Sequence, residues 1–349
     1  MTAFSPRATY RDIRAYDVEP QACEIQLADN TSPFGPPPAS LRAIAEHTNN
    51  ALARYPTTYS RELREAIARY VGVAPDEVMV GGGSDEVMSC AFRALVDPPA
   101  RVTMIDPTFV MARVFAITNS QRVTTVPLLP DFDADVAGLV AGDPQLIYLC
   151  TPNNPTGTPL RPETIQRVIG ESRAIVLLDE AYAEYAGTNY AAQAPGTDRL
   201  LVLRTFSKAF GLAGLRVGFA VGARSLIAEL EKARGPYAVT TLSERAAHAA
   251  LTEDLSWVDG GVQRLVASRD RFAAALRDAG YAPVPSQANF VLLPVRDSGA
   301  AMRALRERGI LVRHFHGLTG VGEALRISIA DWPVMQRVLE AMKECVPCE

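Results

Sequence analysis

Short apolar runs alternate with amphipathic stretches along the chain from about residue 60 to residue 222. Several of these runs are continuously apolar and rich in β-branched residues, which is typical of strands that helices cover on both faces. We expect strands at Val78–Val80, Val102–Ile105, Val123–Val126, Leu146–Cys150, Ile175–Leu178, Leu200–Leu203 and Val217–Val221. Apolar residues at helical spacing lie between them, for instance at Arg61–Tyr70, Asp85–Val96 and Pro162–Gly170. This alternation predicts an α/β fold with a mostly parallel central sheet.

The pattern changes after about residue 240, where two helical stretches precede a mixture of strands and helices. The expected helices are Ser243–Leu251, Trp257–Ala279, Ser298–Arg308 and Pro333–Glu344, and the expected strands are Asn289–Pro294, Ile310–Phe315 and Leu325–Ile329. We therefore expect an N-terminal segment, residues 1–30, that packs on a small domain. The large domain covers residues 31–240, and the small α+β C-terminal domain covers residues 241–349.

The composition is that of a globular protein. Its 349 residues include 35 Lys+Arg against 39 Asp+Glu, so the formal net charge is −4, which argues against a nucleic-acid or anionic-membrane partner. No run reaches the roughly 18 apolar residues of a membrane span, and the N-terminus lacks the apolar core of a signal peptide, so we expect a cytoplasmic protein. The five cysteines are scattered and odd in number, which favours reduced thiols, and neither they nor the four dispersed histidines predict a metal site.

The candidate chemistry follows the strands, because ligands of open α/β sheets bind beyond the carboxyl ends of the strands. Three glycines, Gly81–Gly83, follow the first expected strand and precede a helix, whose first N–H groups can bind an anion. Lysine occurs at only three positions, and only Lys208 follows a strand, since Lys232 and Lys343 lie in amphipathic helices. The other strand ends carry Asn154, Asp179, Tyr182, Thr205, Ser207 and Arg216.

One ligand uses all of these groups, and it is pyridoxal 5'-phosphate (PLP). A lysine amine forms a Schiff base with its aldehyde, and an acid keeps its pyridine nitrogen protonated. Hydroxyl groups, an arginine and helix N–H groups bind its phosphate. We therefore expect PLP as the cofactor, with Lys208 as the amine and Asp179 as the acid.

At these residues the sequence resembles the fold-type I PLP-dependent aminotransferases of class I/II. The matching motifs are Thr151-Pro-Asn-Asn154-Pro-Thr-Gly157, Asp179-Glu-Ala-Tyr182 and Thr205-Phe-Ser207-Lys208-Ala-Phe-Gly-Leu-Ala-Gly-Leu-Arg216. Within that family the chain is most similar to the histidinol-phosphate aminotransferases, over nearly its whole length. The motifs for this are Asp29-Asn-Thr-Ser-Pro-Phe-Gly-Pro36, Arg54-Tyr-Pro56, Gly83-Ser-Asp-Glu86, Asp106-Pro-Thr-Phe109, Ser286-Gln-Ala-Asn-Phe290, Gly309-Ile-Leu-Val-Arg313 and Leu325-Arg-Ile-Ser-Ile329.

The resemblance implies a role for each of these residues and a homodimer with shared active sites. Lys208 would carry the cofactor and move a proton between substrate and cofactor carbons, while Asp179 would pair with the pyridinium. Asn154 and Tyr182 would hydrogen-bond the phenolate oxygen, and Phe109 would stack on the ring. The phosphate would be bound by Ser84, Asp85, Thr205, Ser207, Arg216 and, from the neighbouring subunit, Tyr55. The substrate end would be lined by Arg326, which would clamp a carboxylate, and by Arg313, Tyr16 and Asn30.

Three positions differ from the family pattern, and they leave the substrate open. Thr31 replaces the usual Glu, Phe109 replaces a frequent Tyr, and Ala330 replaces the usual Gly. The first hypothesis is transamination between L-histidinol phosphate and 2-oxoglutarate, in histidine biosynthesis. The alternatives are an aromatic or natural-product aminotransferase, a PLP lyase similar to threonine-phosphate decarboxylase, and a catalytically inactive relative that serves as a binding protein.

Overall fold

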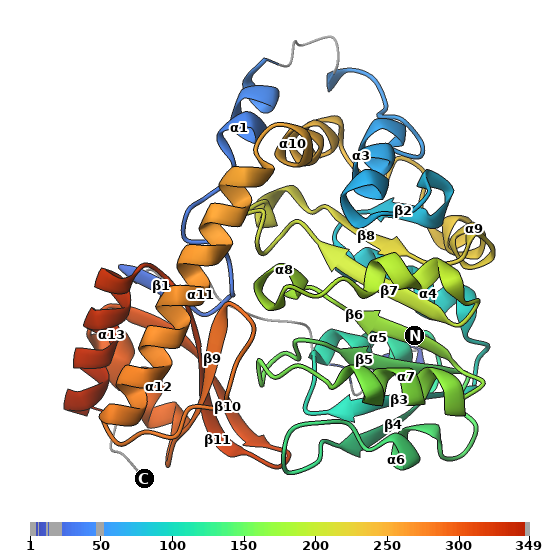
Figure 1. Ribbon diagram of the computed structural model, residues 1–349. Helices are drawn as coiled ribbons and strands as arrows, with labels where there is room; N and C mark the ends of the chain where they lie inside the picture. The colour runs from blue at the N-terminus through green and yellow to red at the C-terminus, as the bar shows by residue number, and fades with distance from the viewer. Residues whose placement is uncertain (1–4, 6, 12, 14–22, 47–51, 346–349) are drawn as a thin grey trace.

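The chain folds around two sheets that lie side by side. The structure is a computed structural model, and it describes residues 5, 7–11, 13, 23–46 and 52–345. One sheet has seven strands and the other has four. Figure 1 shows the long helix α11 (Leu255–Asp278) running from beside α10 down along the smaller sheet. In these ranges, none of the helices combines the length and apolar character that crossing a membrane requires.

The seven-stranded sheet has the strand order β2-β8-β7-β6-β5-β3-β4. Its strands are β2 (Val78–Gly81), β3 (Arg101–Asp106), β4 (Arg122–Pro127), β5 (Leu146–Cys150), β6 (Ile175–Asp179), β7 (Leu200–Thr205) and β8 (Gly218–Val221). The pairs among β3 to β7 are parallel, and β8 runs antiparallel to both of its neighbours, β2 and β7. The parallel strands therefore all end at one edge, where Cys150 is in register with Asp179.

The four-stranded sheet has the order β1-β10-β11-β9. Its strands are β1 (Ile25–Leu27), β9 (Phe290–Pro294), β10 (Ile310–Leu318) and β11 (Gly322–Ser328). β1 pairs in parallel with β10, and the other pairs are antiparallel. The register places Arg313 of β10 directly opposite Arg326 of β11, so the two side chains lie on the same face of the sheet.

The helices cover the sheets. They are α1 (Pro38–Ala45), α3 (Arg61–Val71), α4 (Ser84–Leu95), α5 (Val110–Thr118), α6 (Val136–Val140), α7 (Pro162–Glu171), α8 (Ala183–Ala186), α9 (Arg224–Ala233), α10 (Thr241–Thr252), α11, α12 (Ser298–Glu307) and α13 (Trp332–Cys345). Local sequence explains several ends. The Thr240 side chain accepts from the Ser243 N–H at the start of α10, Asp297 accepts from Ala300 at the start of α12, and Gly72 ends α3 in the left-handed region with φ +86°.

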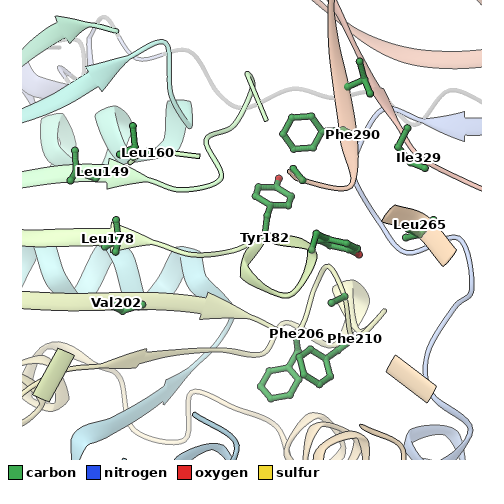
Figure 2. Packing of buried hydrophobic residues seen from close by; sticks show 14 of the residues in the cluster. Leu149, Leu160, Leu178, Tyr182, Val202, Phe206, Phe210, Leu265, Phe290 and Ile329 are labelled. Carbon is green, nitrogen blue, oxygen red and sulfur yellow. The ribbon is translucent and has the colours of Figure 1, made fainter. Parts of the chain in front are cut away.

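The central strands are buried on both faces, as their continuous apolar runs predict. Ile147 and Val176 enter one hydrophobic cluster, whereas Tyr148 and Leu177, their neighbours along the same strands, enter a second one. Beyond the carboxyl ends of the strands, Tyr182 of the large domain lies next to Phe290 of the small sheet (Figure 2). Their rings meet edge to face, with centroids 5.2 Å apart.

The seven strands expected in the large sheet and the three expected in the small sheet are all present, and none of their ends differs by more than three residues. Three features differ from the expectation. The short strand β1 was not expected. Helix α10, expected to begin the small domain, packs against α1 and α3, where the Ser40 hydroxyl donates to the Ala246 carbonyl across 2.8 Å. Within the expected N-terminal segment, the Arg7 guanidinium donates to Ser120 beside β4 of the large sheet. The extents of the domains stay a prediction.

Candidate active site

One pocket collects the polar residues that follow the strands. It lies beyond the carboxyl ends of β5, β6 and β7, beside the start of α4 and facing β11. It is lined by Asp29, Asn30, Ser84, Asp85, Phe109, Cys150, Asn154, Asp179, Ala181, Tyr182, Thr205, Ser207, Lys208, Arg216 and Arg326. The topology explains the set, because loops at the same edge of a parallel sheet converge.

Lys208 follows β7 and supplies the only lysine amine of the pocket lining. Its Nζ donates to the Asp29 carbonyl across 2.8 Å. Burial, and after it the positive charge of Arg326, lower the pKa of Lys208 to about 8. Its amine is therefore neutral in a far larger fraction of molecules near pH 7 than the amine of a free lysine.

Asp179 is the last residue of β6, and its side chain is 4% exposed. Burial raises the pKa of this carboxyl to about 6, although hydrogen bonds from the Tyr148 hydroxyl and the Ala181 N–H oppose the shift. The Tyr148 hydroxyl lies 2.9 Å from Oδ2, and the Ala181 nitrogen lies 3.0 Å from Oδ1. No cationic side chain of the described ranges forms an ion pair with it, so a bound cation is what would favour its ionised form.

The start of α4 forms an anion cradle with Arg216. Gly83 precedes the helix with φ +87°, a conformation that favours glycine, and a Cβ there would push against the Arg216 guanidinium. Arg216 lies 3.1 Å from the Asp85 carboxylate and 3.4 Å from the Ser207 hydroxyl. On the far side, a Cβ on Gly218 would overlap the backbone nitrogen of Ser84. Free N–H groups, hydroxyls and a guanidinium thus converge where an anionic group would bind.

Two further hydrogen-bonding side chains, Asn154 and Tyr182, line the same pocket. The Tyr182 hydroxyl accepts from Asn30 Nδ2 across 3.0 Å, and burial raises the Tyr182 pKa. The side-chain oxygen of Asn154, Oδ1, accepts from Arg326 Nη1 across 2.6 Å, which leaves the N–H groups of the side-chain amide to donate. Both groups follow strands, as the sequence predicts.

The two strand arginines are placed differently. Arg326 is 8% exposed, reaches the pocket and also donates to the Ala28 carbonyl across 2.6 Å. Its guanidinium lies over Phe290 and Phe315, 5.5 and 5.8 Å from the ring centroids. Arg313 is its cross-strand neighbour and is not among the residues that line the pocket.

The remaining predicted site residues are spread out. Phe109 precedes α5 and lines the pocket. Tyr55 lies outside it, 81% exposed, and stacks on Tyr237 with ring centroids 4.6 Å apart. Tyr16 lies outside the described residues.

The sequence reasoning missed Tyr148, Cys150 and Asp29. Tyr148 and Cys150 were absorbed into a strand, yet their spacing of two places them on one face of β5, and Cys150 is in register with Asp179. A hydroxyl within an otherwise apolar strand was the signal that could have identified Tyr148. Asp29 contributes its backbone carbonyl, which no side-chain pattern predicts.

Comparisons with known proteins agree on one family. The sequence profile described as aminotransferase class I and II matches residues 23–342. The chain is 39% identical to a histidinol-phosphate aminotransferase of Roseiflexus castenholzii over 92% of this chain and 89% of that protein. It is 34% identical to one of Desulfitobacterium hafniense, over 97% and 96% of the two chains.

Solved structures show the same architecture. A histidinol-phosphate aminotransferase of Sinorhizobium meliloti in complex with pyridoxal 5'-phosphate superposes with a TM-score of 0.87 at 26% identity, covering 99% of this chain and 98% of the other. An aspartate aminotransferase variant of Thermus thermophilus superposes with a TM-score of 0.80 at 23% identity, covering 93% of this chain and 92% of the other, which indicates a shared fold alone.

Proposed function

The chain belongs to the class I and II aminotransferase family, and we propose that it acts within that family as a histidinol-phosphate aminotransferase. It is a PLP-dependent enzyme of fold type I. The proposed reaction moves the amino group of L-histidinol phosphate to 2-oxoglutarate, in histidine biosynthesis. The observation that carries the proposal is the pocket that joins Lys208, the buried acid Asp179 and the anion cradle of α4 to Arg326.

The pocket residues fit the cofactor. Asp179 is a buried carboxyl with a raised pKa that lacks a cationic partner in the described ranges, and a pyridinium nitrogen would provide one. Gly218 lets the backbone at the start of α4 lie close to β8, and the Arg216 guanidinium lies against Gly83, so backbone N–H groups and a guanidinium meet where a phosphate group would bind. When bound, PLP supplies an aldehyde that condenses with amines and a ring that accepts electrons from the substrate carbon.

The protein's own residues then hold and move protons. Lys208 Nζ, with its pKa of about 8, is neutral often enough to act as a nucleophile and then as a base near neutral pH. Asp179, as a buried carboxylate, would hold the pyridine nitrogen in its protonated form. The cradle residues Ser84, Asp85, Thr205, Ser207 and Arg216 would bind the phosphate, Phe109 would pack on the ring, and Asn154 and Tyr182 would donate to the phenolate oxygen, since all of them line the pocket.

Two arginines suit the proposed substrates. Histidinol phosphate carries a phosphate and an amine but no α-carboxylate, so it needs positive charge where amino acids place their carboxylate. Arg326 lies at the pocket wall, and Arg313 faces it across the β10–β11 pair. The same two guanidinium groups would bind the two carboxylates of 2-oxoglutarate. We place Tyr16 with them at the substrate end.

We also propose that the enzyme is a homodimer with shared sites. Tyr55 and Tyr237 form an exposed stacked pair, and a groove lined by Leu52, Pro56 and Leu242 lies beside them. Exposed aromatic residues at a groove are typical of protein interfaces. In the dimer, Tyr55 would reach the phosphate bound by the partner subunit.

A donor panel tests the substrate assignment. The purified enzyme is assayed with 2-oxoglutarate and each of histidinol phosphate, phenylalanine and threonine phosphate, with kcat/KM and carbon dioxide release measured. A preference for histidinol phosphate of at least about 100-fold supports the proposal, since one well-matched charged contact contributes about 3 kcal/mol. A preference for phenylalanine would replace it with the aromatic aminotransferase, and carbon dioxide release from threonine phosphate would replace it with the decarboxylase.

A further inference from the structure

Asn30 lies between the two sheets, on the segment that joins β1 to α1. It is 1% exposed and adopts the left-handed region with φ +55°, which a residue other than glycine rarely does. The Asn289 side chain donates to its carbonyl oxygen across 3.0 Å. Contacts with the small domain therefore hold Asn30 in this uncommon backbone conformation.

The contacts of Asn30 determine which way its side-chain amide points. Its backbone N–H donates to the Ser328 Oγ across 2.9 Å, and that hydroxyl lies 2.8 Å from Asn30 Oδ1. The serine hydroxyl thus accepts the backbone N–H and donates its own hydrogen to Oδ1. The amide nitrogen therefore faces the other way, toward the Tyr182 hydroxyl 3.0 Å away.

This orientation determines where the Tyr182 hydrogen goes. An amide N–H only donates, so the Tyr182 oxygen accepts from Asn30 and its own hydrogen must point elsewhere. Among the residues that the structure describes, Asn30 is the side chain that hydrogen-bonds this hydroxyl, and Tyr182 lines the pocket. The hydrogen is thus available to a group bound in the pocket.

We propose that Asn30, held by Ser328, is a positioning residue that makes Tyr182 a hydrogen-bond donor toward an anionic oxygen of the bound cofactor. The inference rests on the proposed function and adds to it a residue that acts through Tyr182. The expectation that Asn30 also lines the substrate end stays a prediction. It also connects the small sheet to the cofactor, because Ser328 ends β11 whereas Tyr182 follows β6.

The test compares the visible absorption of bound PLP as a function of pH in the holoenzyme of wild type, Asn30→Asp, Tyr182→Phe and the double variant. The visible band changes when the nitrogen that joins Lys208 to the cofactor takes up a proton. A donor that stabilises the anionic oxygen of the cofactor makes this nitrogen less basic, so loss of the donor raises the pKa of the spectral change. An aspartate at position 30 accepts the Tyr182 hydrogen and reverses the hydrogen bond. We expect each single variant to raise this pKa by about one unit, the value of a hydrogen bond to a charged group.

The double variant separates an indirect effect from a direct one. If Asn30 acts through Tyr182, Asn30→Asp adds no further shift in the Tyr182→Phe background. An equal shift in both backgrounds would show that the new carboxylate acts by its charge alone, and this would overturn the proposal, as would the absence of a shift. The charged groups that surround the cofactor, the same in every variant, are Asp29, Asp85, Asp179, Lys208, Arg216 and Arg326.

Two further variants complete the experiment. Ser328→Ala releases the Asn30 amide without adding charge and should raise the same pKa by a smaller amount. This variant also tests the proposal if the Asn30→Asp protein does not fold.

Asn119→Asp is the control for charge. The Asn119 side chain lies at the end of α5, away from the pocket, where it donates to the Phe115 carbonyl, and the new carboxylate there should cause no shift. A wild-type protein that forms no visible band with PLP would refute the proposed function itself, whereas an active wild type with an unshifted Asn30→Asp refutes this inference alone.

Discussion

The hydroxyl of Tyr148 lies 2.9 Å from Oδ2 of Asp179, with both residues on adjacent parallel strands of the large sheet. Tyr148 is wholly buried and belongs to the cluster beneath the pocket. A neutral hydroxyl in this place stabilises the ionised carboxyl that a pyridinium cation needs, and it does so without supplying a competing positive charge.

Replacing Tyr148 with phenylalanine should therefore weaken the acid. Without the hydroxyl, the pKa of Asp179 rises further, and we expect kcat to fall by about 5- to 20-fold with KM for the amino donor nearly unchanged, since one hydrogen bond to a charged group is lost. Steady-state kinetics measures the effect. Tyr281→Phe, which removes a buried hydroxyl that donates to the Met342 carbonyl near the end of the chain, is the matched control, and a KM change without a kcat change would contradict the assignment.

Asp179 should destabilise the cofactor-free protein. Its pKa is raised from 3.8 to about 6, so between these values the folded state binds more protons than the unfolded state, and stability falls as the pH rises through this window. Above it, Asp179→Asn should unfold with a free energy higher by about 2–3 kcal/mol, and the difference should vanish below pH 3.8. Urea unfolding at several pH values measures this. Asp131→Asn, at an exposed site, should show no such gain, and an Asp179→Asn protein less stable than wild type at pH 8 would refute the argument.

The pKa of Lys208 should govern the uptake of the cofactor. Because burial lowers it from 10.5 to about 8, the rate at which cofactor-free enzyme acquires its visible band should rise as the pH increases and level off above about 8. Lys208→Ala should form no band, whereas Lys232→Ala, on the exposed face of α9, should match wild type. Borohydride reduction followed by peptide mapping identifies the modified amine, and a label on another lysine would refute the site.

Gly218 should be essential to the anion cradle. In Gly218→Ala the new Cβ overlaps the backbone at the start of α4, so the first N–H groups must move away from the phosphate. We expect at least about a tenfold loss of PLP affinity, equal to 1.4 kcal/mol, in an equilibrium titration. Gly170→Ala, where a Cβ meets open space near the end of α7, is the control. Unchanged affinity in Gly218→Ala would show that the cradle does not bind the phosphate.

The sequence predicted the strands and most of the pocket because both depend on local signals. Continuous apolar runs identified the buried strands, and the residues directly after them met at one edge. The three-residue strand β1 is too short to show a period, and it exists only because β10 pairs with it. The Asn30–Ser328 contact joins positions 298 residues apart, and nothing near either residue indicates the other. Tyr55 was predicted to complete the partner's phosphate site, and this stays a prediction.

Subunit complementation tests that last assignment. In the proposed dimer, each site takes Lys208 from one chain and Tyr55 from the other, so Lys208→Ala and Tyr55→Ala each damage both sites of a homodimer. A heterodimer of the two variants contains one site with both native residues and one site that lacks both.

If the chains exchange at random, half of the dimers are mixed and half of their sites are native, so about a quarter of wild-type activity should return on mixing. Mixing Lys208→Ala with an Arg216→Ala variant is the control. In the proposed dimer the same chain supplies Lys208 and Arg216 to a site, so each site of the mixed dimer carries one defect and no native site forms. Activity equal to the mean of the two parents in the Tyr55 mixture would show that each subunit builds its pocket alone.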